Sequence, residues 1–274
     1  MTEGPDAETL GHPDEIDARA DALRALAGSH VQVLVAGAYA FHEYTGIFRD
    51  TKDLDLFLRE RDLEEGFRVL ESAGFRTELE DATWIGKGYR GEWFVDLIFG
   101  SGNGVAVVDD LWFEHARPGR VMGIDVQLAP PEEMIWSKAF VLERERYDGA
   151  DVNHLIRAMG DELDWERLLF RFDRYWEVLL SHLVLYRFAY PSERSKVPDR
   201  VMEVLLERVA AELGTDHPRA VCRGNLMSRV QYRHDLTALG YEDGRRWDEG
   251  ERTATLGAAT DGGSERDVPA GGGR

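Results

Sequence analysis

Two aspartates separated by one residue, Asp53 and Asp55, are the side chains whose type and spacing point most directly to chemistry. They alternate with Leu54, Leu56 and Leu58. Because side chains alternate between the faces of a strand, this run predicts a strand with buried leucines and both carboxylates on its other face. Paired carboxylates repel each other unless a divalent cation lies between them, and oxygen-only ligands suit Mg²⁺. The alternative is a solvated Asp-x-Asp on an edge strand.

The segment before this pair has the pattern of a phosphate-binding turn. Residues 31–36 (VQVLVA) predict a buried strand, and residues 38–44 predict a helix directly behind Gly37. A glycine between a strand and a helix lets backbone N–H groups approach a phosphate, and the helix N-terminus adds the positive end of its dipole. A phosphate-binding turn followed by a metal-binding carboxylate pair is what nucleotide chemistry requires.

Asp96 is an acid within an otherwise apolar run, residues 93–99 (WFVDLIF). Burying a charge costs several kcal/mol unless it is paired or binds a metal. We therefore expect a neighbouring strand to bring Asp96 beside Asp53 and Asp55. The alternative is an acid at a strand end that is neutralised by an arginine such as Arg90.

The order Ala36-Gly37-Ala38 and then Asp53-Leu54-Asp55 resembles the signature of the nucleotidyltransferase superfamily with the polymerase-beta-like fold. Residues 49–56 (RDTKDLDL) are similar to the branch that includes antibiotic nucleotidyltransferases and abortive-infection or type IV toxin nucleotidyltransferases. The family usually has Gly or Ser after the first glycine. Ala38 has no hydroxyl, so a side-chain contact to phosphate is lost, but the backbone contacts remain. The resemblance covers residues 31–155.

This resemblance implies a set of site residues and their roles. The three acids would hold two Mg²⁺ ions, and an acid on a later helix is a candidate general base that a nearby histidine would assist. The implied metal ligands are Asp53, Asp55 and Asp96, the implied triphosphate-binding residues are Gly37, Ala38, Arg49, Thr51 and Lys138, and the candidate base and its assistant are Asp151 and His154.

Several of these residues also have a purely structural interpretation. Lys138 lies in a predicted helix among apolar residues, where a lysine either extends its ammonium group to solvent or meets an anion. Asp148 is a candidate N-cap of a helix over residues 149–159, and His154 on that helix has a structural alternative as well.

Composition and charge limit the class of protein. The chain has 274 residues, of which 43% are apolar, and a net charge of −19. It has the size for one large core or two modest ones, and no run approaches 18 uninterrupted apolar residues. The acidic N-terminus without an apolar segment and the single Cys222 predict a cytoplasmic protein without disulfides. The negative charge disfavours nucleic-acid and membrane binding and favours a small or cationic acceptor.

The predicted fold class is α+β, with a small mixed β-sheet nucleotidyltransferase core, flanking helices and an α-helical C-terminal domain. We predict a flexible tail over 1–14, the core over 15–130, the helical domain over 131–240 and a disordered tail over 241–274. The expected helices are 14–27, 38–44, 62–73, 109–116, 131–145, 149–159, 164–190, 198–213 and 220–236, and the expected strands are 31–36, 53–58, 75–79, 93–99, 105–108 and 121–128.

The function predicted from these features is Mg²⁺-dependent transfer of a nucleoside monophosphate from an NTP to a hydroxyl of an acceptor, with a small molecule favoured. One alternative is a toxin-like nucleotidyltransferase that acts on RNA or protein. Another is a non-catalytic relative that only binds a nucleotide. The sequence leaves open the acceptor, the preferred nucleotide and the oligomeric state.

Overall fold

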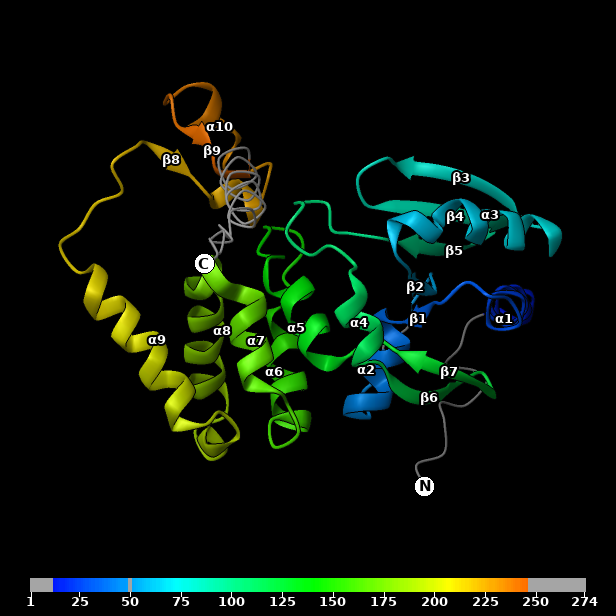
Figure 1. Ribbon diagram of the computed structural model, residues 1–274, viewed down its shortest axis with the longest axis horizontal. Coiled ribbons are helices and arrows are strands. Elements are labelled where there is room, and N and C mark those ends of the chain that lie inside the picture. The colour runs from blue at the N-terminus through cyan, green and yellow to red at the C-terminus, as the bar shows by residue number, and fades with distance from the viewer. Residues whose placement is uncertain (1–11, 49–50, 246–274) are drawn as a thin grey trace, which may run out of the picture. The chain divides into compact units, whose positions relative to one another are not determined.

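The computed structural model describes residues 12–48 and 51–245 of the chain (Figure 1). They form two compact units, the first ending at Asp216 and the second beginning at His217. Most of each predicted tail, residues 1–11 and 246–274, lies outside the described residues. The domain boundary that we predict after residue 130 lies inside the first unit, at the junction between β7 (Ile124–Leu128) and the helix that begins at Pro131.

A seven-stranded mixed sheet forms the centre of the first unit, with strand order β3-β4-β5-β2-β1-β7-β6. The pairs β2–β5 and β1–β7 are parallel, and the other neighbours are antiparallel. Buried leucines such as Leu56 and Leu97 fill its centre. The strands are β1 (Leu34–Val35), β2 (Asp55–Phe57), β3 (Arg76–Asp81), β4 (Ile85–Arg90), β5 (Trp93–Ile98), β6 (Arg117–Val121) and β7 (Ile124–Leu128).

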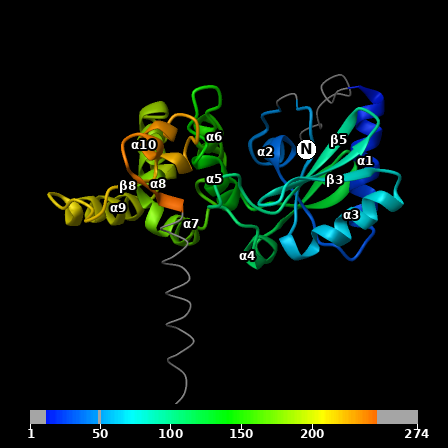
Figure 2. The same cartoon turned by 90° about the horizontal axis from the view of Figure 1, so that it is seen from above.

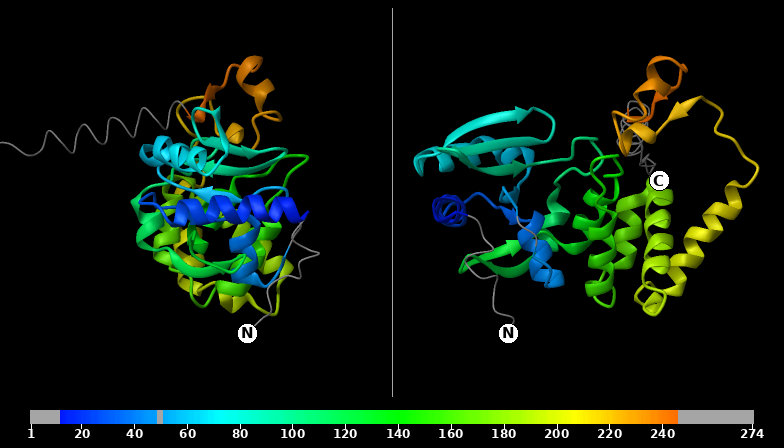
Figure 3. Two further views of the ribbon diagram at one scale, coloured as in Figure 1. Left: turned by 90° about the vertical axis from the view of Figure 1, so that its right-hand side faces the viewer. Right: turned by 180° about the vertical axis from the view of Figure 1, so that it is seen from behind.

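Two helices, α1 (Pro13–Ala27) and α3 (Leu63–Ser72), pack against each other and against the sheet (Figures 2 and 3). Helix α1 ends at Gly28, as predicted, but its N-cap is His12 rather than Asp14. The His12 ring accepts a hydrogen bond from a backbone N–H of the first turn, and a proline at the first helical position favours the earlier start.

Helix α2 (Gly37–Thr45) follows β1 and packs against β6 and α6, and the short helix α4 (Asp110–Glu114) lies between β5 and β6 in the sequence. Trp112 on α4 is fully buried and packs against Phe57, 5.1 Å between ring centroids, which makes it part of the core.

The chain after the sheet is helical, as predicted for this half. Arg171, which is buried on the third of these helices, binds the buried Glu133 at 3.0 Å and Asp109, the N-cap of α4, at 2.6 Å. The helices are α5 (Pro131–Ala139), α6 (Gly149–Met159), α7 (Trp165–Phe172), α8 (Trp176–Ala189) and α9 (Asp199–Glu212). None of the helices among the described residues is long and apolar enough to cross a membrane.

The sequence patterns did not predict strand β4, because its residues, IGKGYR, include two glycines, which are weak strand formers. The structure explains both glycines. A Cβ on Gly86 would lie 2.4 Å from the ring of Phe67, and a Cβ on Gly88 would lie 2.7 Å from Leu70. The glycines therefore let α3 lie close against this strand.

Other predicted elements differ in length or type. Residues 105–108 form no strand, and the predicted strand 121–128 is the second half of the β6–β7 hairpin. Helix α5 ends at Ala139 because residues 142–147 form a small hairpin closed by a Leu142–Tyr147 bridge. The helix predicted over 164–190 is interrupted at Asp173, whose φ is +37°.

The second unit is described from His217 to Arg245. It contains two parallel two-residue strands, β8 (Val221–Cys222) and β9 (Glu242–Asp243), and the helix α10 (Arg233–Thr237) in place of the longer helix predicted over 220–236.

Candidate active site

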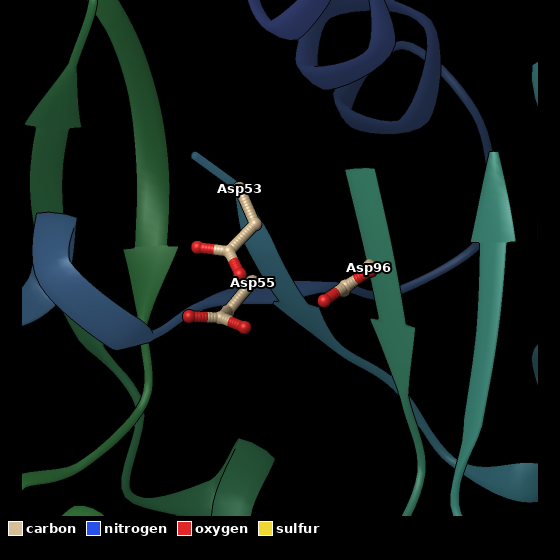
Figure 4. Close-up of side chains that lie close together, drawn as sticks. All are labelled: Asp53, Asp55 and Asp96. Atoms are coloured by element: carbon tan, nitrogen blue, oxygen red, sulfur yellow. The ribbon is translucent and has the colours of Figure 1, made fainter. Parts of the chain in front are cut away.

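The β2–β5 pairing brings the three predicted acids together (Figure 4). Asp55 lies opposite Asp96 in the parallel register, and Asp53 precedes Asp55 by two residues on the same face. Ligand oxygens of all three acids lie within 4.8 Å of one another. The three leucines between and after the acids are fully buried, which confirms the predicted alternation.

Gly37 begins α2 and lies directly against this carboxylate cluster. Its φ is +55°, and a Cβ at this position would lie 1.7 Å from Oδ2 of Asp55. Only glycine permits this approach. The N-cap residue, Ala36, makes no side-chain hydrogen bond to the first turn, and Gly37 and Ala38 are half-buried. The backbone N–H groups at the start of α2 therefore lie beside the acids without a side-chain cap.

Burial strongly perturbs the carboxylates. Burial first, and then the negative charges of Asp53 and Asp96, raise the pKa of Asp55 to about 7. The positive charges of Lys138 and Arg146 act in the opposite direction. Burial also raises the pKa of Asp96. A cation bound among the three acids would lower both pKa values, because an opposite charge nearby favours the ionised carboxylate.

The partner of Asp96 is Lys87 on β4, which sequence reasoning missed together with that strand. Lys87 lies opposite Asp96 in the β4–β5 register, and its Nζ donates to Asp96 Oδ1 at 2.7 Å. Arg90, the partner named as the alternative, instead binds Asp21 at 2.6 Å. Asp96 therefore has a basic partner, as the alternative supposed, but the partner is Lys87 and not Arg90. Lys87 binds one of the two carboxylate oxygens of Asp96.

Thr51 contacts Asp53, and its role in triphosphate binding stays a prediction. Its Oγ1 donates to Asp53 Oδ1 at 2.5 Å. Arg49, the other triphosphate-binding residue predicted in this segment, lies outside the described residues.

Lys138 does not extend to solvent but binds two acids. Its Nζ lies 2.9 Å from Oδ2 of Asp151 and 3.4 Å from Oδ2 of Asp148. Asp148 also accepts a hydrogen bond from Arg146 at 3.1 Å, and although it occupies the N-cap position of α6, it makes no side-chain cap hydrogen bond. The positive charges of Lys138 and Arg146 both lower the pKa of Asp55 and so oppose the effect of its burial.

His154 lies on α6 against α2. Its ring packs edge-on against Phe41, 6.2 Å between ring centroids. This contact is the packing expected of the structural alternative. Arg146 was not named among the site residues predicted from sequence, although it begins the Arg-x-Asp-x-x-Asp segment that contains Asp148 and Asp151.

The raised pKa of Asp55 predicts that the metal-free protein becomes less stable as the pH rises. The folded value is about 7 and the ordinary value is 3.8, so between them the folded state binds more protons than the unfolded state. The free energy of unfolding then falls by at most ~1.4 kcal/mol per pH unit. Chemical denaturation in EDTA at pH 5, 6 and 7 tests this for the wild type and Asp55→Asn. A stability difference between the two that does not change with pH would contradict the assignment.

The chain is similar to several known proteins. A family model described as "Uncharacterised nucleotidyltransferase" matches residues 22–188. No curated protein matches the chain. Among solved structures, ANT(2")-Ia in complex with adenylyl-2"-tobramycin has 16% identity and a TM-score of 0.45, with 59% of this chain and 99% of that chain covered. Lincomycin-bound LnuA, a lincosamide antibiotic adenylyltransferase, has 15% identity and a TM-score of 0.38, with 51% and 94% covered. An antigenic nucleotidyltransferase-like protein from Paracoccidioides brasiliensis has 18% identity and a TM-score of 0.45, with 68% and 94% covered.

Proposed function

Because the chain belongs to the nucleotidyltransferase family whose model spans residues 22–188, we propose that it moves a nucleoside monophosphate from an NTP to a hydroxyl of a small acceptor in the presence of Mg²⁺. The observation that carries this proposal is the cluster of Asp53, Asp55 and Asp96 beside the glycine that opens α2. A carboxylate cluster next to a helix N-terminus suits a metal-bound triphosphate.

The three acids fit Mg²⁺ by donor type and by spacing. Mg²⁺ takes oxygen ligands at about 2.0–2.1 Å in octahedral geometry, so two oxygens on opposite sides of one ion lie about 4.2 Å apart. The ligand oxygens of Asp53, Asp55 and Asp96 lie within 4.8 Å of one another, so small side-chain shifts would bring all three to the distance at which they contact one ion. We propose two ions, as in other two-metal sites. When bound, the metal neutralises phosphate charge and makes the acceptor hydroxyl more acidic.

The protein's own residues would position the reactants. Backbone N–H groups at Gly37 and Ala38 would donate to the triphosphate, and Lys138 and Arg146 would add positive charge to it. The acceptor oxygen forms a bond to the α-phosphorus while the bond from that phosphorus to the bridging oxygen breaks, and pyrophosphate leaves. In this proposal the proton of the acceptor hydroxyl passes to the carboxylate of Asp151, which lies 2.9 Å from Lys138 in the ligand-free protein.

The class of acceptor is supported by charge alone. The net charge of −19 disfavours polyanions and favours a small or cationic hydroxyl compound. The two other candidates are transfer to RNA or protein, and nucleotide binding without transfer.

One experiment separates these functions. The purified protein is incubated with each NTP labelled at the α-phosphate and with the small-molecule, RNA and protein fractions of a cell extract, in Mg²⁺ and in EDTA. Mg²⁺-dependent label in the small-molecule fraction supports the proposal, and label only in RNA or protein moves the acceptor to that class. Mg²⁺-dependent nucleotide binding by calorimetry without label in any fraction supports the non-catalytic relative.

Lys138→Met tests the triphosphate contact. We expect NTP affinity in Mg²⁺ to fall ~10- to 100-fold, because a charge-assisted contact contributes about 1.5–3 kcal/mol. Calorimetric titration with the NTP measures it. Lys196→Met, at a lysine that pairs with Asp161 elsewhere in the first unit, is the control and should leave the affinity unchanged. Equal NTP affinities for the two variants would reduce Lys138 to a structural partner of Asp151.

A further inference from the structure

Asp53 lies just outside the hydrogen-bonded ladder that holds its two partner acids. Strand β2 begins at Asp55, and Asp96 lies within β5, so both have a backbone fixed by strand pairing. Residues 51–54 have no regular secondary structure. The Asp53 carboxylate accepts a hydrogen bond from Oγ1 of Thr51 at 2.5 Å. Leu54 on the other side of Asp53 is held by its carbonyl, which accepts from Asp96 N at 2.9 Å, so the Thr51 side is where the Asp53 carboxylate is oriented by a contact outside the ladder.

The residue that holds Thr51 is a buried arginine on α1. Arg19 is only 1% exposed, and its Nη2 donates to the backbone carbonyl of Thr51 at 2.9 Å. The same Nη2 lies 2.5 Å from Oε1 of Glu15, one helical turn earlier, which balances its charge. Its Nη1 donates to the hydroxyl of Tyr39 at 3.1 Å.

These contacts join both halves of the active site to one side chain. Thr51 donates a hydrogen bond to Asp53, and Tyr39 lies two residues after Gly37 in the first turn of α2. Tyr39 is buried, only 5% exposed. A planar guanidinium with separate N–H groups can hold two segments at once, whereas a lysine ammonium is a point charge.

We propose that Arg19 is a positioning residue that fixes Asp53 for metal binding through the backbone of Thr51. The inference rests on the proposed function, because it takes Asp53 to be a metal ligand. A side chain that orients a metal ligand typically changes metal affinity or activity 10- to 100-fold when it is removed. Burying the Glu15–Arg19 ion pair costs desolvation free energy. Apolar side chains at these two positions would pack α1 against the sheet without that cost, so packing alone does not explain the pair.

The competing explanation is that the Glu15–Arg19 pair only anchors α1 to the sheet. That role predicts a loss of stability when the pair is removed, with unchanged Mg²⁺ affinity in the folded protein. The positioning role predicts a loss of Mg²⁺ affinity that is shared with Thr51→Val, because both changes release the same carboxylate.

The test uses the double variant Glu15→Gln/Arg19→Met, which removes the ion pair without leaving an unpaired buried charge. Arg19→Lys keeps the positive charge and serves as the second variant in case the double variant does not fold. Thr51→Val breaks the last contact in the series. Arg24→Met is the matched control, since Arg24 is exposed on the same helix and pairs with Asp21. Each full-length protein is titrated with Mg²⁺ by calorimetry, and amide hydrogen exchange is followed over residues 51–54 in the metal-free state.

We expect Mg²⁺ affinity to fall ~10-fold or more in the double variant and in Thr51→Val, to fall less in Arg19→Lys, and to stay within twofold in Arg24→Met. Combining the double variant with Thr51→Val should weaken binding little beyond Thr51→Val alone. Exchange over residues 51–54 should quicken in the double variant and in Arg19→Lys.

A folded double variant, or a folded Arg19→Lys, with wild-type Mg²⁺ affinity and unchanged exchange over residues 51–54 would overturn the inference. If the wild type itself binds no Mg²⁺, the proposed function fails, and the positioning inference fails with it. A wild type that binds Mg²⁺ while the Arg19 variants bind equally well leaves the proposed function intact and rejects only the role of Arg19.

Discussion

Replacing Asp53 or Asp55 by asparagine should lower nucleotidyl transfer by about a thousandfold or more without unfolding the protein. Asparagine has the same shape but no charge and offers one oxygen, so it cannot neutralise the ion that the proposal places here. Activity in saturating Mg²⁺, measured with the NTP and acceptor identified by the labelling experiment, checks the loss. Circular dichroism and thermal unfolding check the fold.

Asp55→Asn should also make the metal-free protein more stable at neutral pH. The carboxylate that it removes is buried beside two other acids, and its raised pKa reports the cost of charging it. Asp125→Asn provides the control, because Asp125 lies on β7 of the same sheet with 93% of its side chain exposed. Wild-type activity in either site variant would remove the three acids from the mechanism.

Gly37→Ala is expected to be the next most damaging change. The added methyl group would lie 1.7 Å from Oδ2 of Asp55, so either the start of α2 or the carboxylate must move. The positive φ of +55° adds about 1–2 kcal/mol of backbone strain for a residue with a Cβ. We expect a loss of more than about 2 kcal/mol of stability and at least ~100-fold of activity. Denaturant unfolding and steady-state kinetics measure the two effects.

Helix α2 supplies a matched control for this substitution at its other end. Gly46 has a φ of +70°, but a Cβ there would have nothing within 4 Å. Gly46→Ala should therefore lose about 1–2 kcal/mol of stability from backbone strain while it keeps its activity. If Gly37→Ala and Gly46→Ala lose equal stability and both stay active, the close approach of Gly37 to Asp55 has no functional importance.

The sequence contained enough to predict the pairs of site residues that are close along the chain. The alternation of Asp53 and Asp55 with leucines determines which face they share, because a strand repeats every two residues. The glycine between a strand and a helix is likewise a local signal, and so is the change to helical periodicity after Pro130. These features were confirmed because neighbouring residues alone decide them.

Contacts between residues far apart in the sequence could be predicted only where a general physical rule required them. A lone acid in an apolar strand needs a cation or a metal ion beside it, and a shared metal ion is the reason for expecting Asp96 beside the other acids. The rule does not say which cation comes near. Lys87 was missed because β4 carries two glycines, and those glycines become intelligible only against Phe67 and Leu70 of α3.

The sequence by itself determined the carboxylate pair, the glycine turn before it and the need for a third acid. Only the tertiary structure decided that Lys87 binds Asp96, that Lys138 lies between Asp148 and Asp151, and that Arg19 reaches Thr51 and Tyr39 from α1. The physical reason is that a local pattern fixes the face on which a side chain lies. Which distant residue that side chain contacts depends on strand order and helix packing. These are decided by the total energy of many weak contacts between residues far apart in the sequence.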